Sequence, residues 1–202
     1  MLINITGLTN INMHKNLPNL YIFIDKYNHL LFEKKNKNVG VIYRNYNSVN
    51  REKELIKIEK ACKKKRYKLF VSNDIKLTLK SKADGIYIPD FNRSKKNLNL
   101  EKRNIIILGS AHNQKEIQEK ISQKCKAIFL SPLFYIKKSK KFMGLYKFNL
   151  LSYSNKINIL ALGGINEHNF CKLKLLNIYG FGGMGMFKKK PAFKKAGFLK
   201  FY

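Results

Sequence analysis

The stretch "NILALGGINEHNF", residues 158–170, joins an apolar run to two glycines and then to a polar segment. Residues 159–162 are typical of a parallel strand that is buried on both faces. Gly163 and Gly164 allow a tight turn or a close approach of the backbone to a ligand. Asn166 is predicted as the N-cap of a following helix. A strand, a glycine pair and a helix start often form a seat for phosphate, and the alternative is an ordinary turn between a strand and a helix.

Apolar runs of the same kind recur along the whole chain. Most are rich in Ile, Val, Leu and Phe and end in a polar or small residue, which is typical of parallel strands covered on both sides. They lie at residues 20–25, 39–44, 68–73, 85–89, 104–110, 127–132, 158–164 and 180–187.

Helical patterns separate several of these runs. Asn50 is expected to cap a helix after the second run, and Asn113 with Glu116 predicts a capping box after the fifth. After the seventh run a helix is expected to bury Phe170, Leu173 and Leu176, and after the eighth a helix starting near Pro191 is expected to bury Phe193, Ala196 and Leu199. The two earlier helices are expected to bury Leu55, Ile58 and Cys62, and Ile117, Ile121 and Cys125.

Strands that alternate with helices predict an α/β protein with a parallel sheet. An open doubly wound sheet usually carries its phosphate glycines after the first strand. Here glycines follow the seventh and eighth strands, at Gly163, Gly164, Gly182, Gly183 and Gly185, where (β/α)8 barrels often bind phosphate. We therefore predict a single, compact (β/α)8 TIM barrel over residues 19–202 behind an N-terminal extension, residues 1–18.

Composition narrows the choice of partners and compartment. The net charge is +29, but nearly all of the excess is Lys, spread along a chain that is also rich in Asn, Ile, Tyr and Phe. These residues share A/T-rich codons, and a dedicated nucleic-acid binder is expected to use more Arg, so no specific nucleic-acid partner is predicted. Cys62, Cys125 and Cys171 form no metal or disulfide pattern. With no secretory or membrane-spanning pattern, we expect a cytoplasmic protein without a membrane partner.

Polar residues at the ends of the predicted strands form the candidate site, because barrels collect their chemistry there. Arg44 suits a phosphate, or alternatively an ion pair with Asp25 or Asp74. Asp74 is a candidate Mg²⁺ ligand, and Asn73 a contact for a heterocycle. His112 is a candidate acid or base, or a structural residue. Lys137 and Lys138 could close over a pyrophosphate, or form a solvated loop. Other polar residues at strand ends are Asp90, Asn92, Ser110 and Ser131.

Five segments, in this order and spacing, resemble the thiamine phosphate synthase and thiazole tautomerase superfamily of (β/α)8 barrels. They are "VIYR" (41–44), "LFVSNDIKLTLKSKADGIYIP" (69–89), "ILGSAHNQKEI" (107–117), "AIFLSPLF" (127–134) and "ILALGGINEHNF" (159–170). The resemblance covers roughly residues 20–187. It implies an enzyme of thiamine biosynthesis that joins hydroxymethylpyrimidine pyrophosphate to thiazole phosphate, with Mg²⁺ and release of pyrophosphate.

The resemblance also implies roles for single residues. Arg44, Asn73 and Ser110 would be catalytic, and Asp74 and Asn92 would hold Mg²⁺. The substrates, both phosphorylated small molecules, would be bound by Lys137, Lys138, Gly163, Gly164, Gly183, Met184 and Gly185.

The chain departs from the family pattern at several of these positions. Ile42 and Tyr46 replace the Gln and Lys of a Gln-x-Arg-x-Lys element, and Asn92 replaces a carboxylate. "IKKS" (136–139) replaces a Thr-x-Thr-Lys element, Gly185 replaces a Ser, and Pro132 stands where the tautomerase branch has a His. The alternative to coupling is therefore a family member that binds or isomerises a thiazole phosphate or thiamine phosphate without joining the two substrates.

Overall fold

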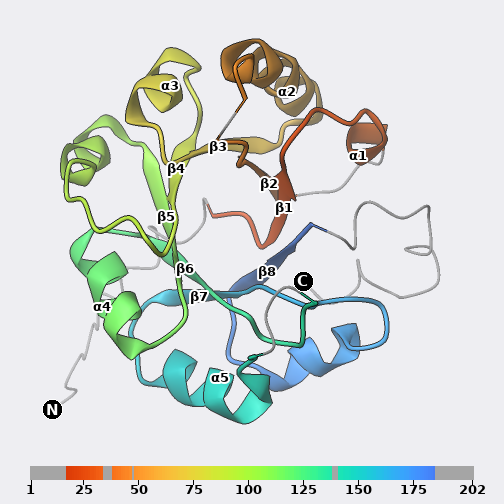
Figure 1. Cartoon of the computed structure of the whole chain (residues 1–202), viewed down its shortest axis with the longest axis vertical. Helices are drawn as coiled ribbons and strands as arrows, with labels where there is room; N and C mark the ends of the chain where they lie inside the picture. Colours follow the sequence, from red (N-terminus) through yellow and green to blue (C-terminus); the bar gives the residue numbers. More distant parts are fainter. Residues whose placement is uncertain (1–16, 34–37, 47, 138–140, 185–202) are drawn as a thin grey trace, which may run out of the picture.

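A computed structural model of the chain describes residues 17–33, 38–46, 48–137 and 141–184. Parallel strands close into a barrel in chain order, as predicted, and β1 completes the ring by pairing with β8 (Figure 1). The strands are β1 (Leu20–Ile24), β2 (Val39–Tyr43), β3 (Lys68–Ser72), β4 (Gly85–Ile88), β5 (Ile106–Ala111), β6 (Ala127–Leu130), β7 (Asn158–Ala161) and β8 (Gly180–Gly183).

The helices lie outside the strands and several are short, which fits a compact barrel (Figure 1). They are α1 (Leu30–Glu33), α2 (Arg51–Lys65), α3 (Ile75–Lys80), α4 (Gln114–Ser122) and α5 (Gly144–Tyr153), with the 3-10 helices η1 (Leu98–Arg103) and η2 (Phe170–Leu175). The helix predicted after Pro191 lies outside the described residues. None of the helices described here is both long and apolar enough to cross a membrane.

Helix α2 confirms the predicted buried face, whereas α4 corrects one. In α2, Leu55, Ile58 and Cys62 are all buried. In α4, Ile117 is buried as expected, but Ile121 is exposed and Lys120 takes its place in the interior. The stem of Lys120 fits there because Gly109 on β5 carries no side chain; a Cβ at Gly109 would lie 3.0 Å from the Lys120 stem. The ammonium group then reaches acceptors in the loop after β4.

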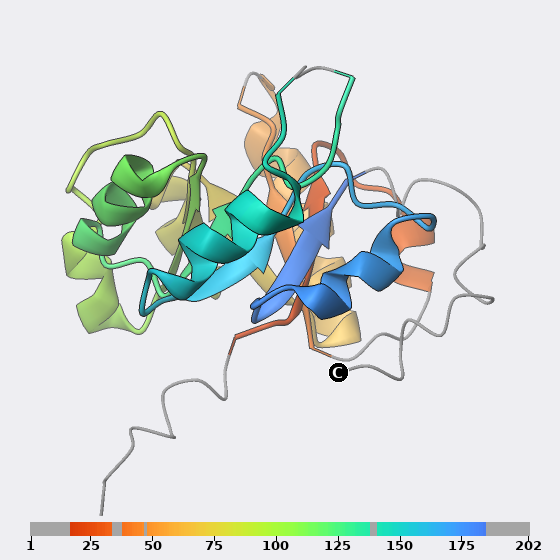
Figure 2. The same cartoon turned by 90° about the horizontal axis from the view of Figure 1, so that it is seen from below.

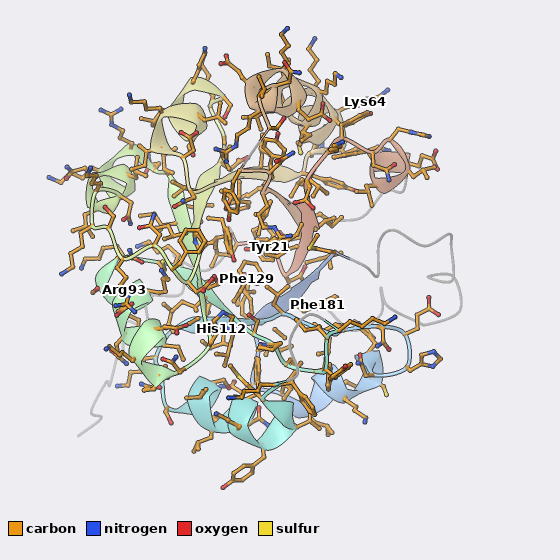
Figure 3. The ribbon with its side chains drawn as sticks, in the orientation of Figure 1. Tyr21, Lys64, Arg93, His112, Phe129 and Phe181 are labelled. Carbon is orange, nitrogen blue, oxygen red and sulfur yellow. The ribbon has the colours of Figure 1, made fainter. Side chains whose placement is uncertain are left out.

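Aromatic rings fill the interior of the barrel. Phe129 packs edge-to-face against Tyr21 and Phe23, with ring centroids 5.1 and 5.2 Å apart, and Phe23 packs likewise on Tyr87 at 5.4 Å. Figure 3 shows Tyr21 and Phe129 inside the ring of strands, with Lys64 on the outside. The interior is thus a packed core rather than a channel, so a ligand must sit at an end of the barrel.

Candidate active site

The loops that follow the strands rise from one end of the barrel, where the loop after β6 projects furthest (Figure 2). The glycine pair after β7 packs against this loop. Gly163 and Gly164 have φ values of +95° and +71°, and a Cβ on either would collide with the backbone of the β6 loop. Backbone hydrogen bonds from Leu133 to Leu162 (2.9 Å) and from Phe134 to Gly163 (3.0 Å) join the two loops. Close packing therefore requires both glycines, and their role as a phosphate seat stays a prediction.

The residues after the glycine pair differ from expectation. Asn166 was predicted to cap a helix, but the Oδ1 atom of Asn166 accepts a hydrogen bond from the backbone N–H of His168 (2.9 Å) within a turn. The following helix, η2, begins only at Phe170 and has 3-10 geometry. The N-cap prediction is wrong because Asn stabilises such turns as readily as it caps helices. Leu173 is buried as predicted, while Phe170 and Leu176 are half-buried.

A cavity of about 370 Å³ opens at this end of the barrel. Arg44 lies in it with its Nε atom 3.6 Å from Asp25 Oδ1, so of the two predicted carboxylate partners Asp25 is the one that it meets. The Nη2 group of Arg44 also lies 3.1 Å from the sulfur of Met184, which brings together the predicted site residues that directly follow β2 and β8. The lining consists of Asp25, Arg44, Asn45, Tyr46, Tyr87, Pro89, Asp90 and Phe91.

Asp74 lies just after the end of β3, and both of its carboxylate oxygens have partners. Oδ1 accepts a hydrogen bond from the backbone N–H of Leu77 (2.9 Å) and so caps α3. Oδ2 accepts from Arg51 Nη1 (3.0 Å), and Arg51 Nη2 donates to the carbonyl of Ser72 (2.5 Å). Arg51 was not among the predicted site residues. It holds Asp74 in a fixed orientation and balances its charge.

The side chains of Asn73 and Asn92 form a bridge between the ends of β3 and β4. Asn92 Nδ2 donates to Asn73 Oδ1 (2.5 Å), and Asn92 Oδ1 accepts from the backbone N–H of Ser94 (2.8 Å). Asn73 has a φ value of +57°, in the left-handed region that Asn tolerates better than most residues. Its N–H donates to the Tyr87 carbonyl (2.8 Å). The bridge therefore joins two predicted site residues, and the backbone of Asn73 is hydrogen-bonded to Tyr87, which lines the cavity.

Tyr46 presents a neutral hydroxyl group where the family resemblance expects a Lys. Its hydroxyl is 2.8 Å from Ser72 Oγ, and burial raises the pKa of the Tyr46 phenol. Its ring meets Phe91 with centroids 6.3 Å apart. The Arg51 guanidinium lies 5.9 Å from the ring centroids of both Tyr46 and Tyr43. A positive charge is thus present near this position, but it comes from the start of α2.

His112 connects the ends of three neighbouring strands. Its Nδ1 atom is 2.6 Å from the Ser131 carbonyl and must carry the hydrogen in that contact. Its Nε2 atom lies 3.5 Å from Asp90 Oδ2, and both side chains are about 40% exposed. Ser110 of β5, two residues before His112, is buried. His112 can hold or move a proton at Nε2, facing the cavity that Asp90 lines.

Comparison with known proteins supports the family resemblance. The family model described as thiamine monophosphate synthase matches residues 35–185. The chain belongs to this family. A thiamine-phosphate synthase of Prochlorococcus marinus subsp. pastoris is 35% identical over 128 residues, which are 60% of this chain and 36% of that relative. A second one, from Prochlorococcus marinus strain AS9601, is 34% identical over 129 residues. The chain thus matches about a third of these relatives' length.

A solved structure supports the fold of the thiamine monophosphate synthase family for this chain. Thiamine phosphate pyrophosphorylase from Pyrococcus furiosus superposes with a TM-score of 0.76 at 20% identity, covering 92% of this chain and 95% of that protein.

Two residues, Asp74 and Asn92, stand at the positions where the family resemblance predicts metal ligands. Asp74 is the single carboxylate at the two predicted metal positions, and Asn92 offers only its amide oxygen. The described part of the chain contains no group of three His, Cys, Asp or Glu side chains placed to bind a metal. Mg²⁺ is commonly held by one or two carboxylates together with substrate phosphates. Asp74 and Asn92 would supply two oxygen ligands to a Mg²⁺ ion, and a phosphorylated substrate would have to supply others.

A buried lysine supports the loop that carries Asn92. Lys120 Nζ donates to the carbonyls of Pro89 (2.8 Å) and Asn92 (2.7 Å) and to Gln123 Oε1 (3.0 Å). Gln123 Nε2 donates to the Asn92 carbonyl as well (3.0 Å). Burial lowers the pKa of Lys120. In the sequence, the one feature that could have indicated a buried Lys120 is its spacing, because it lies three residues after Ile117 on the face of the helix that is otherwise apolar.

The other predicted substrate-binding residues take no part in the contacts described above. Lys137 is exposed in the loop after β6. Lys138 and Gly185 lie outside the described residues, and Gly183 ends β8.

Proposed function

We propose that this chain is a thiamine phosphate synthase that couples hydroxymethylpyrimidine pyrophosphate to thiazole phosphate and releases pyrophosphate. The observation that carries the proposal is that Asp74, the Asn73–Asn92 bridge and an aromatic-lined cavity all follow strand ends in a barrel of this family. The cavity volume of about 370 Å³ lies within the range of about 300–1,000 Å³ that is common for small-molecule sites.

The coupling reaction needs a site that binds two rings and an anionic leaving group. The CH₂–O bond of the pyrimidine substrate breaks, and both electrons leave with the pyrophosphate. The thiazole nitrogen then donates its lone pair to the CH₂ carbon and forms the new C–N bond. Tyr46, Tyr87 and Phe91 line the cavity and offer aromatic surface for the rings. Asn73, whose N–H donates to the Tyr87 carbonyl, would offer a side-chain amide for the polar edge of the pyrimidine.

The phosphate of the thiazole substrate and the pyrophosphate of the pyrimidine substrate would be bound by different residues. The Nη2 group of Arg44 lies 3.1 Å from the sulfur of Met184, and this contact supports a role for Arg44 in binding the phosphate of the thiazole substrate near the end of β8. When bound, Mg²⁺ would offset charge on the departing pyrophosphate. Asp74 and Asn92 are the residues that would hold it. Losing one contact of this electrostatic kind costs on the order of 3 kcal/mol in the barrier.

The proposal is tested by incubating the purified protein with both substrates and Mg²⁺ and measuring thiamine phosphate by thiochrome fluorescence. Product that depends on both substrates supports coupling. If folded protein forms no product yet binds thiazole phosphate, the coupling proposal fails and the chain is a family member that binds or isomerises such a ligand. The replacement of the expected Lys by Tyr46 is the observation that favours this second candidate.

A further inference from the structure

Helix α5 is apolar on the face that points away from the barrel as well as on the face that packs against it. Phe148 is buried in the core, whereas Tyr146, Leu150 and Tyr153 are 85%, 57% and 73% exposed. These three exposed residues, four and three positions apart, lie along one side of the helix and form what we name the α5 stripe. A helix that is apolar on all sides is normally covered on all sides. The α5 stripe is therefore a surface that fits a partner.

Helix η2 extends this apolar surface. Figure 1 and Figure 2 show η2 beside α5 on the outside of the barrel. Asn149 Nδ2 donates to the Leu175 carbonyl (2.8 Å), and Asn149 Oδ1 accepts from the backbone N–H of Asn177 (3.0 Å). Asn149 lies three residues after Tyr146 and four before Tyr153, so these bonds fasten the exposed Leu175 next to the α5 stripe.

The size of this surface suits an interface with a protein. The four large side chains of the α5 stripe and Leu175 are each more than half exposed, and together they present on the order of 500 Å² of mostly apolar area. A stable interface buries about 800 Å² on each partner, and a little over half of that area is apolar. Contiguous apolar patches of several hundred Å² often mark interaction sites.

The charge pattern around the α5 stripe suits contact with a second copy of the chain. Because the net charge is +29, two copies repel one another over most of their surface. Helix α2 carries Lys, Arg or Glu along most of its length, but the one charged residue of α5 is Lys147. A contact centred on the α5 stripe therefore keeps like charges away from its centre.

The spacing of the α5 stripe is self-complementary. At 1.5 Å per residue, Tyr146 lies about 6 Å before Leu150 along the helix axis, and Tyr153 lies about 4.5 Å after it. When two α5 helices pack antiparallel around a two-fold axis at Leu150, Leu150 meets its own copy. Tyr146 of one copy then faces Tyr153 of the other. Such reciprocal contacts are typical of the interface of a two-fold symmetric dimer.

We propose that the outer face of α5 and the end of η2 form the interface of a homodimer, with Leu150 at the two-fold axis. The inference goes beyond the coupling function and does not rest on it, because the α5 stripe lies outside the barrel whereas the candidate active site lies at the strand ends.

The test measures the association state of the purified full chain by sedimentation equilibrium, between about 1 and about 100 µM. We expect a dimer with a Kd of about 10 µM or tighter, since interfaces of standard size bind in the micromolar range or below. Raising the salt concentration from about 0.15 M to about 1 M is expected to tighten the dimer, because the Debye length falls from about 8 Å to about 3 Å and screens the repulsion between the copies.

Charged substitutions at Leu150 test the position of the axis. Leu150→Lys and Leu150→Glu each place like charges opposite one another and are expected to weaken the dimer at least about 100-fold. An equimolar mixture of the two variants is expected to form dimers again, because opposite charges then face each other across the axis. The matched controls are Ile56→Lys and Ile56→Glu, since Ile56 is an apolar residue of α2 that is 45% exposed. Alone or mixed, they are expected to stay within about twofold of wild type.

Circular dichroism of the variants shows whether a loss of dimers reflects a loss of folding. The inference is overturned if the wild type is a monomer at the highest concentration and salt, because something other than a second copy then covers the α5 stripe. It is also overturned if the Ile56 variants weaken the dimer as much as the Leu150 variants do, or if mixing the two folded Leu150 variants restores no dimer.

Discussion

Replacing Gly164 with Ala tests why two glycines follow β7, and Gly144 provides a matched control. Both residues have left-handed backbones, with φ values of +71° and +70°. A Cβ at Gly144 meets no atom within 4 Å, so Gly144→Ala costs only the left-handed strain of about 1 kcal/mol. A Cβ at Gly164 would lie 2.6 Å from the Tyr135 carbonyl oxygen and 2.7 Å from that of Phe134. Forcing the β6 loop away adds roughly 1–3 kcal/mol.

We therefore expect Gly164→Ala to lower the free energy of unfolding by about 2–4 kcal/mol, against about 1 kcal/mol for Gly144→Ala. Urea unfolding followed by circular dichroism measures both values, and similar m-values would confirm that the same surface unfolds. Equal destabilisation by the two substitutions would refute the reasoning. It would show that a glycine is needed at position 164 only for its left-handed backbone, and that the loops after β6 and β7 are not in close contact.

Three further predictions concern charge and burial. Asp74→Asn keeps a good N-cap for α3 but loses the ion pair with Arg51, so we expect a folded protein whose coupling rate falls at least about 100-fold in the thiochrome assay. Lys120→Met leaves two buried acceptors without a donor and is expected to cost about 2 kcal/mol in urea unfolding, whereas Ile121→Lys at the exposed neighbouring position stays within about 0.5 kcal/mol. Iodoacetamide at pH 8 should label Cys171 alone in the native protein, because burial raises the pKa of the other two thiols to about 12; rapid labelling at all three cysteines would contradict their burial.

The barrel could be predicted from sequence because most strands are apolar on both faces and end in a polar or small residue. Such runs can be recognised from local sequence alone. The position of the glycines after the seventh and eighth runs then favours a closed barrel over an open sheet. Helix α5 was not predicted, since Phe148 and Ser152 are its only buried residues among those described and give no apolar stripe. Ile121 was assigned to the interior because hydrophobicity alone cannot anticipate that a Lys will find three acceptors there.

The site could be predicted only as a set of strand ends. The sequence places Arg44, Asn73 and Asp74 at one rim, but whether Arg44 meets Asp25 or Asp74 depends on distances across the barrel. Arg51 was missed because it is 23 residues before Asp74 and starts a helix rather than ending a strand. A further cavity, of about 240 Å³, is lined by Lys76 of α3 and by Asn92 and Asn97 after β4, and no local sequence pattern predicts that these segments enclose a space.

The proposed coupling reaction joins two substrates, whereas a binding protein or a hydrolase would act on one. The most direct measurement quantifies pyrophosphate and thiamine phosphate released from the same reaction containing both substrates and Mg²⁺. Coupling predicts that the two products form in equal amounts and that omitting thiazole phosphate abolishes both. Pyrophosphate release without thiamine phosphate, or no release by folded protein, would contradict the account.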